Sequence, residues 1–490
     1  MNASRIATCA LLLGALALSF AAPAQSLGVR LAPDTLTRQD AFGASVAISG
    51  DLALVGAPSC GLCPLGSGQG AAYLFRRQPD ELGAWIELLQ LAAGDPQLDD
   101  GFGFAVAIDG DVAVVGAPFR AGPIPHAGAV HVFERDHDES GQWGEVVRLS
   151  LSAPTPQEQF GISVGVSGDV IVVGAWRYDV PYTDCGAAYV YEREPDSPRS
   201  WRFVRRLTPN APAAVDLFGR EVAVFGDRIV VGAVGDDSAG DSAGAAYIFE
   251  RDAGGPGAWG EAAKLVGNDT EALDLFGASV AVYGDTVAVS APGGDGAAFR
   301  SGTTYLFHPD AEHPGAWHQA ATLVGDPVAW DQAGAGVALW RDLALIGNPL
   351  HDNAGSDSGI SRLFLRDRGG VGAWEHAATI SAAEVTADDG FGAANALWET
   401  WAVVGASGDD GACEGDPNCN SGAAYVFDLR ACRADVDLDG AVGLSDLSNL
   451  LSNFGVQSGA SFDDGDLDLD GDVELADLSD LLASYGKTCP

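Results

Sequence analysis

The sequence is poor in basic residues. Its 490 residues contain 26 lysines and arginines against 68 aspartates and glutamates, a formal net charge of −42 at pH 7. A chain of this charge repels phosphate backbones and anionic lipid, so we expect no nucleic-acid partner and no binding to a membrane surface. Small cations are the partners that this charge favours.

Long apolar runs are also scarce. The one at residues 7–22 is interrupted by a glycine and a serine and falls short of the roughly 20 apolar residues that span a bilayer. Arg5 precedes this run and Ala22-Pro23-Ala24 ends it, which is typical of an export signal with a small-x-small cleavage site. We therefore predict a signal peptide at 1–24, no membrane span, and a protein that is secreted, extracellular or on the cell surface.

Cysteine is sparse, and export makes disulfides permissible. Cys9 leaves with the signal peptide, and seven cysteines remain. The predicted pairs are Cys60 with Cys63, Cys413 with Cys419, and Cys432 with Cys489, which leaves Cys185 unpaired. A zinc site is the alternative for the first pair, although no second pair of ligands lies at zinc-finger spacing.

Recognisable catalytic motifs are missing. There is no Gly-x-Ser-x-Gly, His-Glu-x-x-His or phosphate-binding loop. Three evenly spaced histidines, His308, His313 and His318, could suggest a metal site, but no carboxylate is placed to match them. Carboxylate pairs for glycoside hydrolysis are defined by their separation in space, which a sequence does not give. The sequence favours a protein that is not an enzyme and leaves the question open.

What the sequence has in abundance is a repeat. A Phe-Gly pair followed by two short stretches rich in Val and Ala returns at a nearly constant spacing through most of the chain. The copies begin at Phe42, Phe102, Phe160, Phe218, Phe276 and Phe391, with a divergent copy at Ala333-Gly334. A fixed period of this size indicates an architecture in which each unit buries part of its neighbours.

The repeat that begins at Phe102 illustrates the predicted unit. After the Phe-Gly come the strand FAVAI, the turn Asp109-Gly110-Asp111 and the strand VAVVGAP. Gly128 opens a third strand and Trp143 a fourth. The inner strands are almost all Val, Ala and Gly, as expected where both faces of a sheet are covered. Seven such sheets predict an all-β seven-bladed β-propeller with four-stranded blades over residues 25–430.

The ends of the repeat region predict that the ring closes. In complete repeats a tryptophan starts the fourth strand at a fixed distance before the next Phe-Gly, as Trp85 does before Phe102, but the last repeat ends at Gly422–Arg430 without such a strand. The same distance before Phe42 falls on Gln25. We therefore expect Ser26–Leu31 to complete blade seven, which removes two open sheet edges.

An acidic residue stands two places before each Phe-Gly or its equivalent. These residues are Asp40, Asp100, Glu158, Asp216, Asp274, Asp331 and Asp389. One interpretation is a cation-binding ring of carboxylates. The favoured one is structural: each side chain accepts backbone N–H bonds and shapes the turn into the next blade. The two longer loops between second and third strands, in blades one and seven, carry cysteine pairs that either support a binding loop or only limit proteolysis.

The repeat resembles a known family. The Phe-Gly pairs, Gly-Ala-Pro at 56–58 and 116–118, and Gly-Ala-Ala-Tyr-x-Phe at 70–75 and 244–249 are similar to the FG-GAP repeats of integrin α-subunit propellers and their bacterial relatives. This resemblance implies an extracellular adhesion or recognition role. The calcium loop that often joins the first two strands of integrin blades is replaced here by short turns such as Ser49-Gly50-Asp51. We therefore expect no calcium sites in the blades.

The C-terminal part, 431–490, has a different character. Two twelve-residue segments, which begin at Asp435 and Asp466, fit a calcium loop with carboxylates at positions 1, 3 and 5, glycine at position 6, a backbone carbonyl at position 7 and a carboxylate at position 12. The predicted ligands are Asp435, Asp437, Asp439, Ala441 and Asp446 in the first loop, and Asp466, Asp468, Asp470, Asp472 and Asp477 in the second. Each loop runs into an apolar-periodic segment, LSNLLSNF or LSDLLASY, that predicts a short helix.

Aspartate at position 12 and the single helix after each loop resemble a type I dockerin over Arg433–Tyr485. The resemblance implies two bound Ca²⁺ ions and docking onto a cohesin-like partner, read in part by Leu444-Ser445 and Leu475-Ala476. From Cys432 to Cys489 there are 13 acidic and 2 basic residues, so we expect calcium to fold the segment.

Together these features predict a secreted calcium-binding recognition or adhesion protein. Its propeller, expected to be monomeric, would bind a protein or glycan, and its dockerin-like segment would attach it to a partner. One alternative is a polysaccharide-degrading enzyme, a glycoside hydrolase or lyase, carried by a dockerin-borne complex. The other is a structural component of a surface or matrix.

Overall fold

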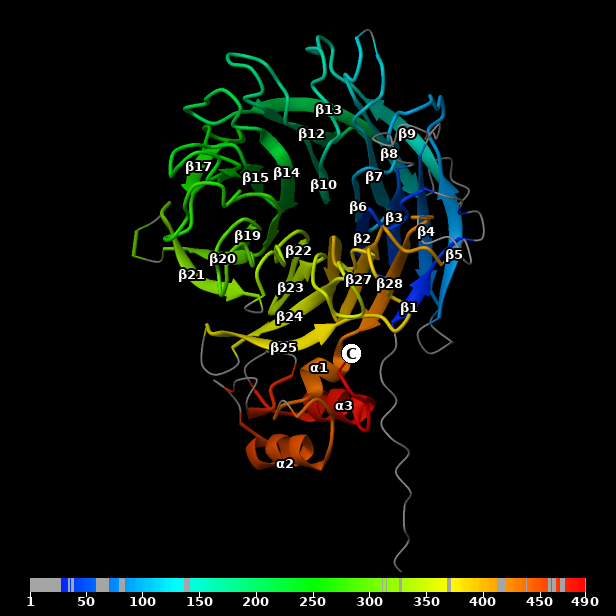
Figure 1. Ribbon diagram of the computed structural model, residues 1–490, viewed down its shortest axis with the longest axis vertical. Helices are drawn as coiled ribbons and strands as arrows, with labels where there is room; N and C mark the ends of the chain where they lie inside the picture. Colours follow the sequence, from blue (N-terminus) through cyan, green and yellow to red (C-terminus); the bar gives the residue numbers. More distant parts are fainter. Residues whose placement is uncertain are drawn as a thin grey trace, which may run out of the picture.

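The computed structural model describes residues 28–33, 36, 39–58, 70–78, 84–122, 124–135, 142–310, 312–313, 315–325, 328–367, 372–411, 419–437, 439–456, 460, 464–467 and 472–489. These residues form seven four-stranded antiparallel sheets and three helices. The sheets stand around a common axis, and the helices lie together beside the ring (Figure 1). The predicted seven-bladed β-propeller is confirmed.

The first three blades each use four consecutive strands. Blade one has β2 (Ser45–Ser49), β3 (Leu52–Ala57), β4 (Ala71–Arg77) and β5 (Trp85–Leu91). Blade two has β6 (Val106–Asp109), β7 (Val112–Ala117), β8 (Ala129–Arg135) and β9 (Trp143–Leu149). Blade three has β10 (Val164–Ser167), β11 (Val170–Ala175), β12 (Ala187–Glu194) and β13 (Ser197–Leu207).

The next three blades repeat this order. Blade four has β14 (Phe218–Phe225), β15 (Arg228–Ala233), β16 (Ala245–Glu250) and β17 (Gly260–Leu265). Blade five has β18 (Val280–Tyr283), β19 (Thr286–Ala291), β20 (Thr303–Pro309) and β21 (Trp317–Val324). Blade six has β22 (Val337–Trp340), β23 (Leu343–Asn348), β24 (Ile360–Arg366) and β25 (Trp374–Ile380).

Blade seven is closed by the N-terminal strand. It has β26 (Ala394–Trp398), β27 (Trp401–Ala406), β28 (Ala423–Asp428) and, as its outer strand, β1 (Val29–Leu31). Val29 lies opposite Val426 and Leu31 opposite Ala424 in an antiparallel pair. The predicted closure is confirmed for residues 29–31, while Ser26 and Leu27 lie outside the described residues.

The Phe-Gly pair holds neighbouring blades together. The phenylalanine is almost fully buried in six blades, and Phe42 meets Tyr73 and Phe75 of the third strand edge-on, with ring centroids 5.6 and 6.0 Å apart. Gly43 has a φ of +91°, and a Cβ there would lie 2.1 Å from the carbonyl oxygen of Ala423. Only glycine fits this close approach between blades. The divergent sixth copy keeps Gly334, with a φ of +102°, and places buried Ala333 where the others have phenylalanine.

Some predicted strand boundaries were wrong by a few residues. The first strand of blade two begins at Val106 instead of Phe104, because the Phe104 N–H donates to the Gly101 carbonyl, 3.0 Å away, and closes a turn. The fourth strand of blade three begins at Ser197, ahead of its tryptophan, Trp201. The turn after Phe-Gly and the geometry of the hairpin set where these two strands begin. The spacing of apolar residues in the sequence shows neither of them.

Three helices follow the propeller: α1 (Arg430–Ala434), α2 (Leu444–Asn453) and α3 (Leu475–Ser484). Helices α2 and α3 begin about one turn before the apolar segments that predicted them. Helix α1 was not anticipated, and it starts where we expected the propeller to end. None of these helices is long and apolar enough to cross a membrane.

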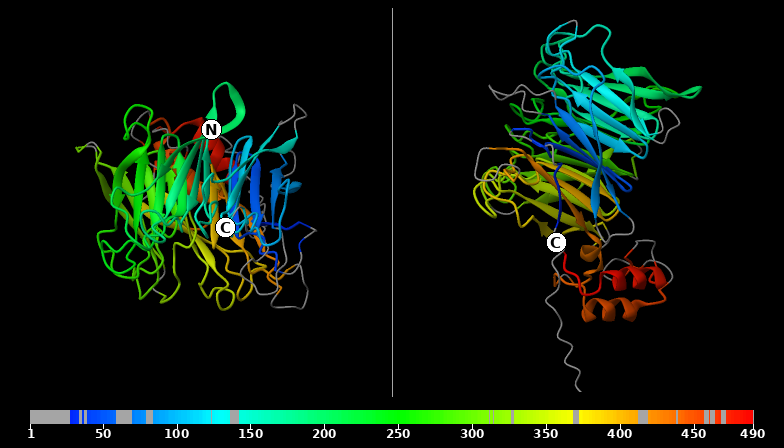
Figure 2. Two further views of the ribbon diagram at one scale, coloured as in Figure 1. Left: turned by 90° about the horizontal axis from the view of Figure 1, so that it is seen from above. Right: turned by 90° about the vertical axis from the view of Figure 1, so that its right-hand side faces the viewer.

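The three helices and the described segments between them, here called the C-terminal module, share a hydrophobic cluster with blades six and seven. Ala431, Cys432 and Ala434 of this module are buried in the same cluster as Leu343 and Val404. Figure 2 shows the module next to one side of the propeller, below β25 in the orientation of Figure 1. The module is therefore packed against the propeller, and its first helix carries the contact.

A channel of about 330 Å³ runs between the innermost strands. Mostly small and apolar residues from six of the blades line it, and serines join neighbouring strands: Ser45 Oγ accepts the Val106 N–H at 2.9 Å, and Ser279 Oγ accepts the Val337 N–H at 3.2 Å. Among the described lining residues, only Arg220 and Glu221 of blade four are charged. The channel is thus narrow, and the charged residues that the structure describes along it come from blade four alone.

Candidate functional site

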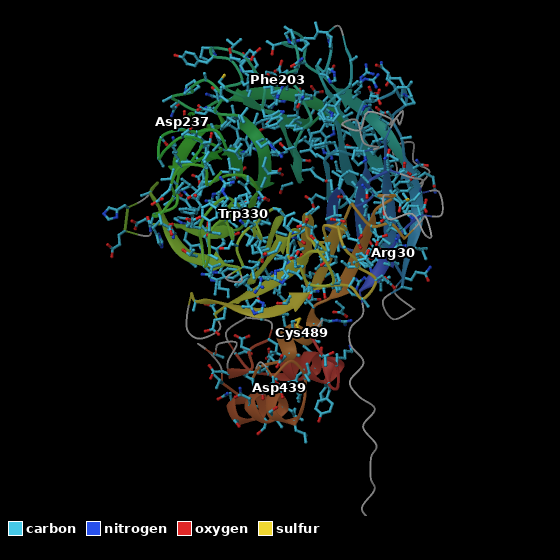
Figure 3. All side chains as sticks on the ribbon, viewed as in Figure 1. Arg30, Phe203, Asp237, Trp330, Asp439 and Cys489 are labelled. Atoms are coloured by element: carbon cyan, nitrogen blue, oxygen red, sulfur yellow. A yellow bond between two sulfur atoms is a disulfide. The ribbon has the colours of Figure 1, made fainter. Side chains whose placement is uncertain are left out.

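The first acidic loop brings three predicted ligands together. One carboxylate oxygen from each of Asp435, Asp437 and Asp439 lies within 4.8 Å of the other two. Asp435 is buried, whereas Asp437 and Asp439 are exposed. Among the described residues, this is the only group of three or more His, Cys, Asp or Glu side chains that could hold a metal ion. In Figure 3, Asp439 lies in the helical module beside the ring.

Hydrogen bonds within the loop explain how four acids can share so small a volume. The Asp435 carboxylate accepts the N–H groups of Asp439 and Gly440 at 3.1 and 3.0 Å. The fully buried Asp446, at position 12, accepts the N–H groups of Val436 and Gly443, both at 2.7 Å. Backbone donors thus hold the carboxylates in a loop conformation that does not require them to contact one another.

The second loop repeats this arrangement. Asp477 is fully buried and accepts the N–H groups of Leu467 and Glu474 at 2.6 and 2.8 Å, as Asp446 does from the equivalent residues. Asp466 is also buried, and Asp472 belongs to the described residues. The predicted ligands Asp468 and Asp470 lie outside the described residues.

The two halves of the module are cross-paired. The Val442 N–H donates to the Lys487 carbonyl and the Gly486 N–H to the Val442 carbonyl, at 2.9 and 2.8 Å. The equivalent bonds join Val473 with Gly455 and Val456, at 2.8 and 3.0 Å. Each loop is therefore tied to the segment that follows the other helix, which gives the module an internal twofold relation.

The described cysteines behave as follows. Cys432 and Cys489 form a disulfide, one of the three predicted pairs, and it joins α1 to the segment after α3. Cys419 is disulfide-bonded, but its predicted partner Cys413 lies outside the described residues. Cys60 and Cys63 lie outside them as well. Cys185 is a free and buried thiol, as predicted.

Both helices of the module expose apolar side chains. Leu444 and Leu475 are 73% and 71% exposed, and they are the first residues of α2 and α3. Leu451 and Leu482, two turns further along, are also exposed. The members of each pair stand at equivalent places in the two halves of the module. These leucines lie beside the two loops and are exposed, so they lower solubility and add little to the hydrophobic core. Exposed apolar patches of this kind are typical of interaction surfaces.

The acids before each Phe-Gly shape turns, as the favoured interpretation holds. In five blades the carboxylate accepts the N–H of the residue three places earlier, at 2.6 to 3.0 Å. These acids are Asp100, Glu158, Asp216, Asp274 and Asp389, and all are buried. In the divergent blade six, Asp331 lies 2.6 Å from Nδ1 of His351. No arrangement of these acids described by the structure gathers three carboxylates within metal-binding reach.

Charged partners differ from blade to blade at this end of the propeller. Arg120 donates to Asp100 at 2.7 Å in blade two, whereas Lys264 contacts Asp236 at 2.7 Å in blade four. Burial, and then the charge of the nearby Asp409, raise the pKa of Asp389 to about 6. The acids before the Phe-Gly pairs therefore do not share one arrangement of charged neighbours.

The three histidines in and near blade five are not gathered into a cluster of ligating side chains among the described residues. His308 lies 3.2 Å from the Thr286 hydroxyl, and burial lowers the pKa of His308. The His308 and His318 ring centroids are 6.3 Å apart, and His313 instead contacts Asp310 at 2.9 Å.

Sequence reasoning missed one charged position, in the channel. Glu221 is half-buried there, and burial raises its pKa to about 7, opposed by the neighbouring Arg220. The signal was present in the sequence, because the other copies have only small or apolar residues in the two places after Phe-Gly. The repeat pattern does not show that the two residues after each Phe-Gly line the central channel.

The fold and the repeat geometry define a propeller built from seven copies of one unit. The FG-GAP repeat family matches six stretches, 29–75, 85–133, 143–191, 201–249, 259–307 and 374–427, and the chain belongs to that family. The unmatched stretch between 307 and 374 contains the divergent Ala333-Gly334 copy, which nevertheless forms a complete blade.

Two further comparisons add little. No curated protein matches the chain. Among 281 matching chains in solved structures is the crystal structure of the WD40 beta propeller domain of Doa1, with a TM-score of 0.44 and 10% identity over 82% of this chain and 96% of that one. The blade count given above rests on the sheet topology alone.

Proposed function

We propose that this protein is a secreted, calcium-binding recognition protein. Its propeller binds a protein or glycan, and its C-terminal module attaches it to a protein partner in the manner of a dockerin. The observation that carries the proposal is the duplicated surface of exposed leucines, Leu444 with Leu475 and Leu451 with Leu482, on the two helices that follow the acidic loops.

The donor set of the loops suits calcium. Ca²⁺ takes six to eight oxygen ligands from carboxylates and backbone carbonyls. In the first loop Asp435, Asp437, Asp439 and Asp446 supply carboxylates and Ala441 a carbonyl, and the second loop would use Asp466, Asp468, Asp470, Asp472 and Asp477. Bound calcium supplies positive charge that offsets the 13 acids of the segment, and the chain's own residues hold the loops open for it.

The leucine surface suits a protein partner. The leucines at position ten of each loop, Leu444 and Leu475, occupy the places that dockerins use to contact cohesins. Because calcium binding orders the loop directly before each helix, loss of calcium should displace both leucines together. Docking would therefore depend on calcium although no leucine touches the ion.

Export is supported by independent features of the chain. The segment 1–24 has the pattern of a signal peptide, and disulfides such as Cys432–Cys489 are typical of oxidising compartments. An acidic, disulfide-bonded propeller outside the cell is suited to display a binding surface, which is the role that the resemblance to FG-GAP propellers implies.

The test uses the full chain, immobilised through an N-terminal tag on the mature protein. Calorimetric titration should find two calcium sites, and calcium should raise the helical circular dichroism of the module. The calcium-loaded protein should then retain a defined partner from the organism's secreted and surface fraction, and chelator should release it.

Matched variants separate docking from adventitious capture. The double change Leu444→Asp and Leu475→Asp should abolish capture and preserve calcium binding, whereas Leu98→Asp, at an exposed propeller leucine, should preserve both. If chelator leaves the module's circular dichroism unchanged, the calcium role is wrong. If the double variant still captures the partner, the docking surface is wrong.

A further inference from the structure

One position breaks the sevenfold repeat into two groups. It is the last residue of the first strand of each blade: Ser49, Asp109, Ser167, Phe225, Tyr283, Trp340 and Trp398. In the first three blades this residue is polar and accepts the N–H of a turn glycine in the next blade, Gly110, Gly168 or Gly226, at 3.0, 2.7 and 3.1 Å. In the other four blades it is aromatic.

The four aromatic residues form a continuous row, here called the aromatic arc. The ring centroids of Phe225 and Tyr283 are 4.6 Å apart, those of Tyr283 and Trp340 are 4.7 Å apart, and those of Trp340 and Trp398 are 4.2 Å apart. Phe225 is 38% exposed and the others are half-buried. Hydrogen bonds at this position thus join blades one to four, whereas aromatic contacts join blades four to seven. The aromatic contacts form a partly exposed apolar surface at the ends of the innermost strands.

A pocket opens directly beside the arc. It has a volume of about 620 Å³ and shares Tyr283 with the arc. Its other lining residues come from blades five and six and include Asp285, Thr286, Arg341, Asp342 and Arg366. Asp342 is only 3% exposed, and its carboxylate lies 3.3 Å from the guanidinium of Arg433 in α1. The exposed Asp285 and the half-buried Asp367 are therefore the carboxylates of this pocket that a ligand can reach.

We propose that the aromatic arc and this pocket form a carbohydrate-binding site, an assignment that rests on the proposed recognition role of the propeller. Arginine only donates hydrogen bonds and ionised aspartate only accepts them. A sugar hydroxyl does both, so it can accept from Arg341 or Arg366 while donating to Asp285 or Asp367. The C–H faces of a sugar ring carry slight positive charge and stack on electron-rich aromatic surfaces. The arc offers such a surface beside the pocket, and Phe225 is its most exposed member.

The mixed charge of the pocket disfavours a single small ion as its ligand. Arginine and aspartate side chains are interspersed along its wall, so neither a cation nor an anion gains a consistent field. A pocket of this size, with an apolar wall and a few convergent polar groups, is typical of small-molecule sites and suits one or two sugar residues at the end of a chain. Further sugars could then extend along the arc.

The site lies at the end of the propeller opposite the acidic ring and next to the C-terminal module. The Leu429 N–H, just before α1, donates at 2.7 Å to the Thr400 carbonyl in the turn after Trp398. Arg433 of α1 lies 3.3 Å from Asp342. A glycan bound at the arc would therefore sit beside the module that attaches the protein.

The test screens the calcium-loaded full chain against an array of neutral and uronic-acid oligosaccharides and then measures affinity for positive probes by calorimetry. Tyr283→Ala and Arg341→Ala should each weaken binding at least tenfold. Phe203→Ala is the matched control, because Phe203 is an exposed aromatic of β13 at the rim of blade three and should leave affinity unchanged (Figure 3). Circular dichroism and the thermal transition of each variant report whether the fold is preserved.

Three outcomes would overturn the assignment. They are no oligosaccharide bound by the calcium-loaded protein, undiminished binding by both folded pocket variants, or Tyr283-dependent binding of an apolar peptide in place of a sugar. In each case two calcium sites and calcium-dependent capture through the leucine surface would leave the proposed attachment function intact, so the two failures are distinguishable.

Discussion

Arg30 of β1 and Asp409 of blade seven lie 2.5 Å apart across the point where the ring closes, although they come from opposite ends of the propeller sequence. Asp409 is only 4% exposed in its side chain and also accepts the hydroxyl of Tyr425 at 2.9 Å. The closing strand is only three residues long, so this ion pair adds to the attachment that its pairing with β28 and the buried Leu31 provide.

Replacing Arg30 should therefore weaken the whole propeller. Arg30→Ala leaves the Asp409 carboxylate buried with one donor fewer, and we expect a loss of about 2 kcal/mol in the free energy of unfolding. Denaturant unfolding at constant pH measures it. Arg76→Ala is the control, because Arg76 and Asp51 form a solvent-exposed pair 3.5 Å apart that should contribute less than about 1 kcal/mol. Equal losses in both variants would show that closure does not depend on this pair.

The channel residue Glu221 predicts a dependence of stability on pH. Its pKa is about 7 in the folded protein against a reference of 4.5, so the folded state retains a proton that the unfolded state releases between these values. Stability therefore falls as pH rises from about 4.5 through 7. Glu221→Gln should remove this loss and stabilise the protein by roughly 2 kcal/mol above pH 7, with little effect below pH 4.5.

Unfolding curves between about pH 4.5 and 8 check this expectation. Arg220→Gln is the companion variant, because Arg220 opposes the effect of burial on the pKa of Glu221. Its removal should raise the pKa of Glu221 further, so the loss of stability should still begin near pH 4.5 but extend to higher pH. Identical pH profiles for wild type and Glu221→Gln would contradict the prediction.

The Cys432–Cys489 disulfide predicts a separate effect on the module. It closes a loop with a sequence separation of 57, worth about 4 kcal/mol in the chain-entropy model. Cys432→Ser with Cys489→Ser should lower the thermal transition of the calcium-loaded helices, followed by far-ultraviolet circular dichroism. Cys185→Ser, at the free buried thiol of blade three, should leave the helical transition in place. A helical transition unchanged by loss of the disulfide would refute the argument.

The contact between Arg433 and Asp342 predicts energetic coupling between module and propeller. Burial raises the pKa of Asp342, and the Arg433 guanidinium 3.3 Å away opposes this effect. Arg433→Ala leaves that carboxylate buried and should cost about 2 kcal/mol. Asp342→Asn in the same chain should recover most of it, so the double-mutant cycle should show a clear interaction energy in denaturant unfolding. Strictly additive changes would mean that the pair contributes nothing.

The repeat period, the blade count and the ring closure could all be predicted from sequence. The Phe-Gly spacing counts the blades, and the lack of a fourth strand after Arg430 predicted that Ser26–Leu31 returns to blade seven, where Val29–Leu31 forms β1. These features are local and repeated, so each copy confirms the others. The loop positions of Asp435 to Asp446 follow the same logic, because ligand spacing within one calcium loop is a local property.

Only the tertiary structure decided which residues meet between repeats. Phe225, Tyr283, Trp340 and Trp398 stand one repeat apart in the chain and each looks like an ordinary strand end, yet they form one row because successive blades place equivalent positions side by side. Helix α1 and the Arg433 contact with Asp342 likewise depend on where the module settles. The physical reason is that sequence periodicity determines which face of a strand is buried, whereas contact across blades depends on the curvature that closes the ring.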